Sequence, residues 1–223
     1  MNWIKRIRSG RFERIFQTLP PNAILLDIGC WNCRSLEPLK RLRPDISMWG
    51  VDRIDYGDNP PSVLDRYIQL DLDKNSLPID PESVDCIRMA HILEHLSNPS
   101  FLIKQLKLLL KKGGVVYISG PNERSLWVPS FNVGHQFHGP FNFFDDPTHV
   151  RPLTIHGIYC YLEMAGFSDD EIQVGIERTG YQFLRVLPTF VKAILLRDRP
   201  KMISGIWTLI GWTSFGMARK FNL

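Results

Sequence analysis

The fold of this chain is decided by residues 23–33, AILLDIGCWNC. Ala23 to Ile28 form a short apolar run, which is typical of a strand buried on both faces of a parallel sheet. The run includes one acid, Asp27, and is followed by a single glycine, Gly29. Ligands of such sheets bind beyond the carboxyl ends of the strands, so this turn is the first place to look for a site.

Strand and helix patterns alternate along the rest of the chain. Apolar residues at helical spacing, ended by prolines and glycines, separate short apolar runs. The expected strands are residues 23–28, 46–51, 67–70, 83–90, 115–119, 171–177 and 182–187, and the expected helices are residues 34–43, 101–112 and 153–166. This order predicts an α/β fold: a Rossmann-like, doubly wound, seven-stranded sheet, mostly parallel with an antiparallel last strand, plus a C-terminal apolar helical extension.

Length and composition limit the number of domains. The chain has 223 residues, 44% apolar and 22% charged, which fits one globular core with an appendage. We expect a basic N-terminal helix over residues 1–19, the main domain over 20–187 and a basic, apolar extension over 188–223. The first residues lack the apolar core and cleavage site of a secretory signal, so we expect a cytoplasmic protein with reduced cysteines, or one on the inner face of the membrane.

Charge is distributed unevenly along the chain. Residues 1–14 hold five bases and one acid and residues 192–223 hold six bases and one acid, which leaves 16 bases and 21 acids in residues 15–191. An acidic central domain argues against a nucleic-acid partner. Basic ends fit an anionic surface such as a membrane, and a solvated charged face is the alternative.

The first two strands together indicate an adenosine-bearing cofactor. The second strand ends in Asp52, at the spacing of the acid that binds a ribose in nucleotide-binding βαβ units. The first turn lacks the Gly-x-Gly-x-x-Gly of a dinucleotide site, which disfavours a nicotinamide oxidoreductase. An acid before Gly29 suits a cationic ligand, and S-adenosylmethionine carries a sulfonium and an ammonium but no phosphate.

Four motifs in this order resemble the class I S-adenosylmethionine-dependent methyltransferases, in particular the ubiquinone-biosynthesis O-methyltransferases and those of bacterial glycan clusters. They are ILLDIGC, GVD, LDLDKNSLPIDPESVDCIRMAHILEHL and LLKKGGVVYISGPN, within residues 20–187. The resemblance implies S-adenosyl-L-methionine as the cofactor and a set of residues that bind it. In this set Asp27, Gly29 and Cys30 form the turn along the methionine moiety, Asp52 binds the ribose, Asp71 and Leu72 border the adenine, and His91 lies near the sulfonium.

The turn departs from the family at Trp31 and Cys33, where glycines are usual. A large side chain there requires the loop to shift or weakens the cofactor site, because backbone ordinarily approaches the ligand closely at this point. The alternative hypothesis is therefore a non-catalytic binding module that keeps the methyltransferase fold. Cys30 and Cys33 form a Cys-x-x-Cys, yet no second pair follows at finger spacing, so we predict no metal site.

The long segment 121–153 is expected to lie over the active site, because loops of that length in compact domains are usually functional. Residues 144–154, FDDPTHVRPLT, resemble the Asp-Pro-Thr-His stretch of glycan- and lipid-modifying methyltransferases. His149 is accordingly the candidate general base, since an imidazole can take the proton of a hydroxyl that attacks the methyl group. The alternative is that Asp146 and His149 only fix the loop by hydrogen bonds, and His95 is a second catalytic candidate.

The C-terminal part has a composition that suits a membrane surface. Residues 202–218 are seventeen uncharged residues with two tryptophans and basic flanks, at the short limit for a membrane span. We therefore expect this segment to lie in the interface, with residues 189–223 contacting the membrane. The alternative is a helix packed on the domain or on a second subunit. The sequence thus predicts an O-methyltransferase for a small-molecule or lipid-linked acceptor, such as a glycan or a prenylated aromatic. It leaves open the oligomeric state and the alternatives of N- or C-methylation.

Overall fold

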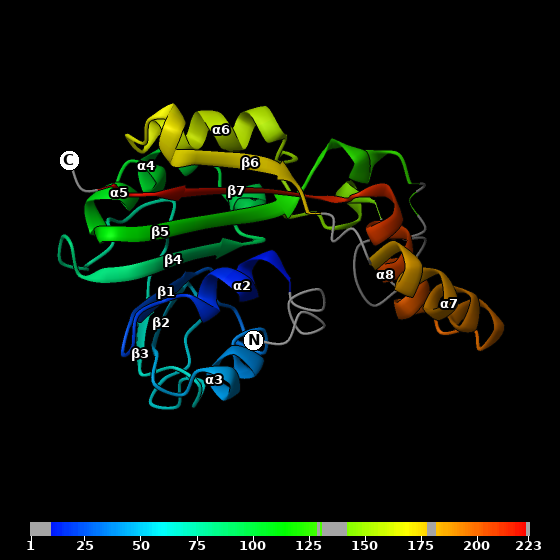
Figure 1. Ribbon diagram of the computed structural model, residues 1–223, viewed down its shortest axis with the longest axis horizontal. Helices are drawn as coiled ribbons and strands as arrows, with labels where there is room; N and C mark the ends of the chain where they lie inside the picture. Colours follow the sequence, from blue (N-terminus) through cyan, green and yellow to red (C-terminus); the bar gives the residue numbers. More distant parts are fainter. Residues whose placement is uncertain (1–9, 129, 131–141, 178–181, 222–223) are drawn as a thin grey trace.

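The computed structural model describes residues 10–128, 130, 142–177 and 182–221. A seven-stranded sheet in the order β3-β2-β1-β4-β5-β7-β6 forms its centre (Figure 1). The strands are β1 (Ile24–Ile28), β2 (Ser47–Asp52), β3 (Arg66–Gln69), β4 (Val84–Ala90), β5 (Leu110–Pro121), β6 (Ile172–Ile176) and β7 (Thr213–Arg219). Strands β1 to β5 run parallel, and β7 is antiparallel to both of its neighbours. The predicted seven-stranded, Rossmann-like α/β fold is confirmed.

Helices cover both faces of the sheet. The α-helices are α2 (Arg11–Gln17), α3 (Glu37–Leu42), α4 (Pro99–Ile103), α5 (Leu106–Leu109), α6 (Ile155–Met164), α7 (Gln182–Leu195) and α8 (Arg199–Ile210), and the short 3-10 helices are η1 (Leu93–His95), η2 (Glu123–Leu126), η3 (Phe143–Asp145) and η4 (Asp169–Glu171). The larger core includes residues of α4, α5 and α6, and the smaller core includes residues of α2 and α3. Successive side chains of β1 enter both cores, since Leu26 belongs to the larger and Leu25 to the smaller. A strand that is covered on both faces needs a continuous apolar run, which is what residues 23–28 supply.

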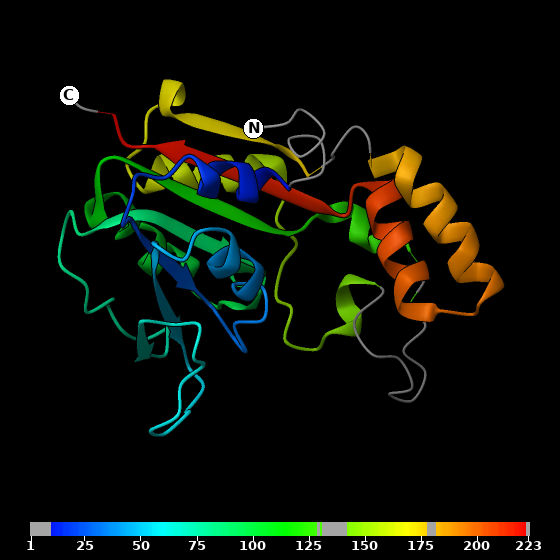
Figure 2. The ribbon, with the colours of Figure 1, turned by 60° about the horizontal axis from the view of Figure 1, so that its bottom comes forward.

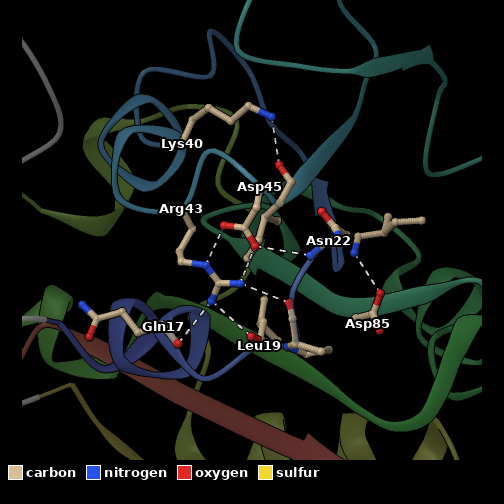
Figure 3. Close-up of polar contacts among 10 residues, drawn as sticks. Gln17, Leu19, Asn22, Lys40, Arg43, Asp45 and Asp85 are labelled. Atoms are coloured by element: carbon tan, nitrogen blue, oxygen red, sulfur yellow. Dashed lines mark hydrogen bonds and ion pairs between the residues drawn. The ribbon is translucent and has the colours of Figure 1, made fainter. Parts of the chain in front are cut away.

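Polar contacts fix the chain at the amino end of β1 (Figure 3). The guanidinium of Arg43 donates to the carbonyl oxygens of Gln17 at 3.3 Å and Leu19 at 3.1 Å, and it pairs with Asp45 at 2.6 Å. The hydrogen bond from Arg43 holds the pKa of Asp45 below its ordinary value. Because Arg43 follows α3 and Gln17 ends α2, one side chain joins the two helices of the smaller core.

The last strand of the sheet differs from the prediction. Residues 182–187, expected as a strand, begin helix α7, and the strand that pairs with β5 is β7. Residues 202–218 are therefore not one interfacial segment, because Gly211, with a φ of 66°, ends α8 and turns the chain into the sheet. The boundary expected at residue 187 is corrected accordingly, since part of the expected extension lies between β5 and β6 in the sheet.

Helices α7 and α8 form a hairpin inserted between β6 and β7. Figures 1 and 2 show this hairpin projecting from the main body at the edge where strands β4 and β5 end. Phe190 of α7 packs on Gly205 of α8, where a Cβ would lie 2.8 Å from the Phe190 ring, so glycine permits the close approach of the helices. No helix in the described part of the chain has the length and hydropathy needed to cross a membrane.

Candidate functional site

The turn after β1 lies at the carboxyl edge of the sheet. Gly29 has a φ of 77°, and a Cβ on it would lie 2.6 Å from Ile92, so glycine is required for two reasons. Asp27 is buried and pairs with Arg88 of β4 at 2.8 Å. Burial raises the pKa of Asp27, and the charge of Arg88 opposes that rise. The carboxylate next to the turn therefore already has a cationic partner within the chain.

Trp31 and Cys33 adopt the left-handed conformation that glycine reaches without strain, with φ angles of 42° and 57°. The Trp31 side chain points to solvent, since this residue is 67% exposed, and its carbonyl oxygen accepts a hydrogen bond from the Tyr56 hydroxyl at 2.5 Å. Cys33 is buried with Cys30, and both are free thiols. Their mutual hydrogen bond and burial raise the pKa of Cys30. The indole ring of Trp31 is thus accommodated in two ways: the backbone adopts a strained left-handed conformation, and the side chain points into solvent.

Asp52 connects the loops that follow β1 and β2. Its Oδ2 accepts the amide N–H of Trp31 at 2.8 Å, and its Oδ1 accepts the amide N–H of Ile54 at 3.3 Å. A carboxylate has about four lone-pair positions, so about two remain for further donors. The residue is only 9% exposed, which keeps the carboxylate in one orientation at the edge of the sheet.

Asp71 and Leu72 follow β3 on the same edge of the sheet. Asp71 pairs with Lys74 at 2.9 Å, and this hydrogen bond lowers the pKa of Asp71. Leu72 is buried in the larger core. The two residues therefore combine a partly exposed carboxylate with an anchored backbone.

His91 directly follows β4 and links that strand to the hairpin. Its φ of 56° is a strained conformation for a residue other than glycine. Its ring stacks on Trp212 with 5.9 Å between centroids, and Trp212 stacks on Trp207 of α8 at 4.6 Å. The sequence does not predict this column, because both tryptophans fit a membrane interface by composition and no local pattern relates them to His91.

Ionisable side chains gather next to His91. Glu94, His95 and His149 each offer one ligand atom, and these atoms lie within 4.8 Å of one another. The rings of His95 and His149 are 4.7 Å apart, and the His149 side chain is 5% exposed because it also packs on Phe143. The structure therefore brings the two candidate histidines together, although 54 positions of sequence separate them.

The partners of the two histidines determine which ring nitrogens carry hydrogen. The carbonyl oxygen of Phe143 can only accept, so Nδ1 of His149, 2.7 Å away, donates to it. The Thr148 hydroxyl donates to Asp146 at 2.6 Å, so its oxygen accepts from Nδ1 of His95 at 2.8 Å. Both imidazoles therefore keep the Nε2 lone pair when neutral. Burial lowers the pKa of His95, which favours that neutral form.

Comparison with known proteins identifies the family. Residues 4–172 match the model of the methyltransferase domain, whereas no curated protein matches the sequence. Among solved structures, an S-adenosylmethionine-dependent methyltransferase of Archaeoglobus fulgidus is 19% identical, with 98% of each chain covered and a TM-score of 0.60. A phosphoethanolamine N-methyltransferase of Haemonchus contortus, bound to phosphomonomethylethanolamine and S-adenosylhomocysteine, is 15% identical with a TM-score of 0.60, and the match covers 99% of this chain and 54% of that chain. The solved structures share the fold, and the family match spans most of the chain, so the protein belongs to the class I S-adenosylmethionine-dependent methyltransferases.

Proposed function

We propose that this methyltransferase methylates a hydroxyl of a membrane-associated acceptor, such as a lipid-linked glycan or a prenylated aromatic, at the cytoplasmic face of a membrane. The observation that carries the proposal is the α7–α8 hairpin, which has an exposed apolar face and joins the main body beside His91. A non-catalytic module would have no need of the paired imidazoles that lie at the same edge of the sheet.

The cofactor is proposed to lie along the carboxyl edge of β1, β2 and β4. When bound, S-adenosylmethionine supplies the methyl group. The residues proposed to hold it are Asp27, Gly29, Cys30, Asp52, Asp71, Leu72 and His91. One observation supports this fit: the Asp52 carboxylate, which accepts two backbone N–H groups, has capacity for about two more hydrogen bonds.

His149 is proposed to remove the proton of the acceptor hydroxyl, or to contact the acceptor closely, and His95 to assist it. The Nε2 lone pair of each neutral ring is the basic group, because each Nδ1 has an acceptor of its own. When the hydroxyl oxygen takes the methyl group and S-adenosylhomocysteine leaves as the neutral thioether, the hydroxyl proton would pass to Nε2. Asp146 Oδ2 lies 3.9 Å from Nε2 of His149 and would stabilise the imidazolium that forms. Low exposure of the ring keeps bulk water away from the base.

The exposed face of α7 is proposed to enter the membrane interface. Its exposed apolar residues recur at helical spacing and are Leu187, Val191, Ile194 and Leu195. The opposite side of α7 is occupied, since Ala193 is buried and Phe190 packs on α8. Exposed basic residues, Lys192, Arg197 and Lys201, flank the apolar face and complement anionic lipid.

Liposome flotation tests the membrane contact. Removing residues 189–223 is not a clean test, because it also removes β7 from the sheet. The double substitution Leu187→Asp and Leu195→Asp retains the fold's core, since the two residues are 48% and 77% exposed. Each leucine contributes roughly 1.5 kcal/mol or more on burial, so the double variant should bind anionic vesicles at least about 100-fold more weakly.

The control for this experiment is Leu108→Asp, at a 58% exposed leucine of α5. Helix α5 lies at the end of the main body away from the hairpin (Figure 1). The unchanged protein and this control should rise with phosphatidylglycerol vesicles at low salt and bind less at high salt. Failure of the unchanged protein to float refutes the membrane contact. If the hairpin face instead joins two copies of the chain, sedimentation shows a dimer that the double variant loses.

Methyl transfer tests the role of His149. The probes are a prenylated catechol and a polyprenyl-linked sugar in detergent micelles, with radiolabelled S-adenosylmethionine as donor. His149→Ala should lower turnover roughly a hundredfold while leaving the affinity for S-adenosylhomocysteine unchanged. His156→Ala, on α6, is the matched control. A loop-fixing role is shown instead if His149→Ala destabilises the fold but turns over normally at low temperature.

A further inference from the structure

We propose that Glu94, His95 and His149 form a binding site for a divalent transition-metal ion that prefers imidazole ligands, such as zinc. The sequence predicts no metal site, because Cys30 and Cys33 have no second pair at finger spacing and the histidines of the long loop follow no metal-binding motif. The ligands proposed here come instead from η1 and from the segment that follows η3, which only the folded chain brings together.

The first observation is the environment of Glu94. Its side chain is fully buried, and among the described residues neither carboxylate oxygen accepts a hydrogen bond. His91 Nδ1 lies 3.2 Å from Oε1, which is an ion pair only when His91 is protonated. A buried carboxylate without hydrogen bonds is strongly disfavoured unless a cation neutralises it. Within the described part of the chain, the buried Glu94 carboxylate therefore has no group that balances its charge permanently, and a bound metal ion would be such a group.

The second observation is the tautomer of the two histidines. Nδ1 of His149 donates to the carbonyl oxygen of Phe143, and Nδ1 of His95 donates to Thr148, whose own hydroxyl is held by Asp146. Metal-binding histidines almost always have such an arrangement, in which one ring nitrogen donates to a fixed acceptor and the other faces the ion. Both Nε2 lone pairs are therefore oriented independently of any ligand.

The geometry requires only a small movement of side chains. Two ligand atoms that share an ion at about 2.1 Å are at most about 4.2 Å apart. One possible ligand atom of each of the three residues lies within 4.8 Å of those of the other two, so a shift of roughly half an ångström would bring them within reach of a shared ion. Two imidazoles and one carboxylate are a donor set suited to zinc and neighbouring transition metals, whereas magnesium prefers oxygen ligands alone.

The ion and the acceptor would compete for the same lone pairs. This consequence rests on the proposed function, in which Nε2 of His149 takes the acceptor proton. A nitrogen bound to zinc cannot accept a proton, so the metal-bound enzyme should be inactive and a chelator should restore activity. Metal binding itself depends only on the three side chains.

Calorimetry with zinc chloride on the full chain, without cofactor or acceptor, tests the site. We expect one ion per chain and at least a tenfold loss of affinity in Glu94→Gln and in His95→Ala. Glu94→Gln removes a buried charge at nearly constant volume, and thermal unfolding checks that the variant is folded. The control is His156→Ala, because His156 and Cys160 lie 3.6 Å apart and are an alternative zinc pair.

Absorption of the cobalt(II) form identifies the ligand type. Nitrogen and oxygen ligands give no thiolate-to-cobalt charge transfer, so such a band would place the ion on Cys160 or on the Cys30 and Cys33 thiols. Unchanged zinc affinity in Glu94→Gln, loss in His156→Ala, or a thiolate band overturns the site. If zinc binds as expected but methyl transfer to the micellar probes is unaffected, the competition is refuted. If no form of the enzyme methylates those probes, the proposed function fails while the calorimetric result stands.

Discussion

Replacing Asp52 by alanine tests the cofactor site at its best-defined group. The carboxylate accepts two backbone N–H groups, from Trp31 at 2.8 Å and from Ile54 at 3.3 Å, and keeps about two lone-pair positions. These positions are proposed to accept both ribose hydroxyls. The substitution removes the acceptors for the ribose and for the two loops together.

The expected loss can be worked from these contacts. Hydrogen bonds to a charged group contribute about 1.5–3 kcal/mol each, and the freed hydroxyls recover part of this from water. We expect Asp52→Ala to weaken S-adenosylhomocysteine binding by about 2 kcal/mol or more, which is roughly 30-fold in Kd. Asp52→Asn keeps an oxygen that can accept the Trp31 N–H. Its Kd for S-adenosylhomocysteine should therefore lie between those of the unchanged protein and Asp52→Ala.

Isothermal titration with S-adenosylhomocysteine is the assay, and urea unfolding separates binding from folding. Asp58→Ala is the control, because Asp58 is an exposed carboxylate that the proposed site does not include. An unchanged Kd in Asp52→Ala refutes the ribose assignment. An equal loss in Asp58→Ala shows that net charge, and not Asp52, governs the affinity.

Three further substitutions test the surroundings of the site and the sheet. Trp31→Gly should leave stability unchanged or raise it by up to about 1 kcal/mol in urea unfolding, because relief of the left-handed strain offsets the entropy of glycine; a larger loss contradicts this. Glu171→Gln should remove at most about 3 kcal/mol of stability that is present above pH 4.5 and lost between pH 4.5 and 2. Burial alone would raise the pKa of Glu171, but hydrogen bonds from Lys107 and from two backbone N–H groups together outweigh it and lower that pKa to about 2. An unaltered pH profile of unfolding counts against this prediction. Gly216→Ala should lower thermal stability by about 1–3 kcal/mol, because its Cβ would lie 2.3 Å from Ile158; an unchanged Tm refutes the packing of β7 on α6.

The parallel half of the sheet was predictable because its strands are buried on both faces. Such strands are continuous apolar runs ended by polar residues, and Asp27 and Asp52 do lie at the carboxyl ends of β1 and β2. The antiparallel half was not predictable in the same way. Residues 213–219 contain Thr, Ser and Gly and follow a helix without a break in hydropathy, so their pattern gives no sign of a central strand.

The sequence could predict those residues of the candidate site that lie in a recognisable motif, but not the contacts between residues of different motifs. His95 and His149 could be named from their motifs, but their contact depends on how the segment after β5 returns over η1, where Val150 N–H donates to the Glu94 carbonyl oxygen at 2.7 Å. The role of Glu94 was also hidden, because an isolated glutamate in a sequence gives no sign of being buried without a hydrogen bond. The contact between the two histidines and the burial of Glu94 arise from tertiary packing, which the order of residues in the sequence does not show.

The position of the hairpin explains how contact of α7 with a membrane would bring a lipid-linked acceptor to the histidines. Trp212 immediately precedes β7, is 4% exposed and stacks on His91, so the base of the hairpin is part of the core and not a free hinge. The amide side chain of Asn122, at the end of β5, donates to the carbonyl oxygen of Gly211 at 2.8 Å and fixes the same junction. These contacts fix the base of the hairpin next to the end of β4. A membrane bound by α7 would therefore present its lipid-linked groups to the imidazoles without a large rearrangement of the enzyme.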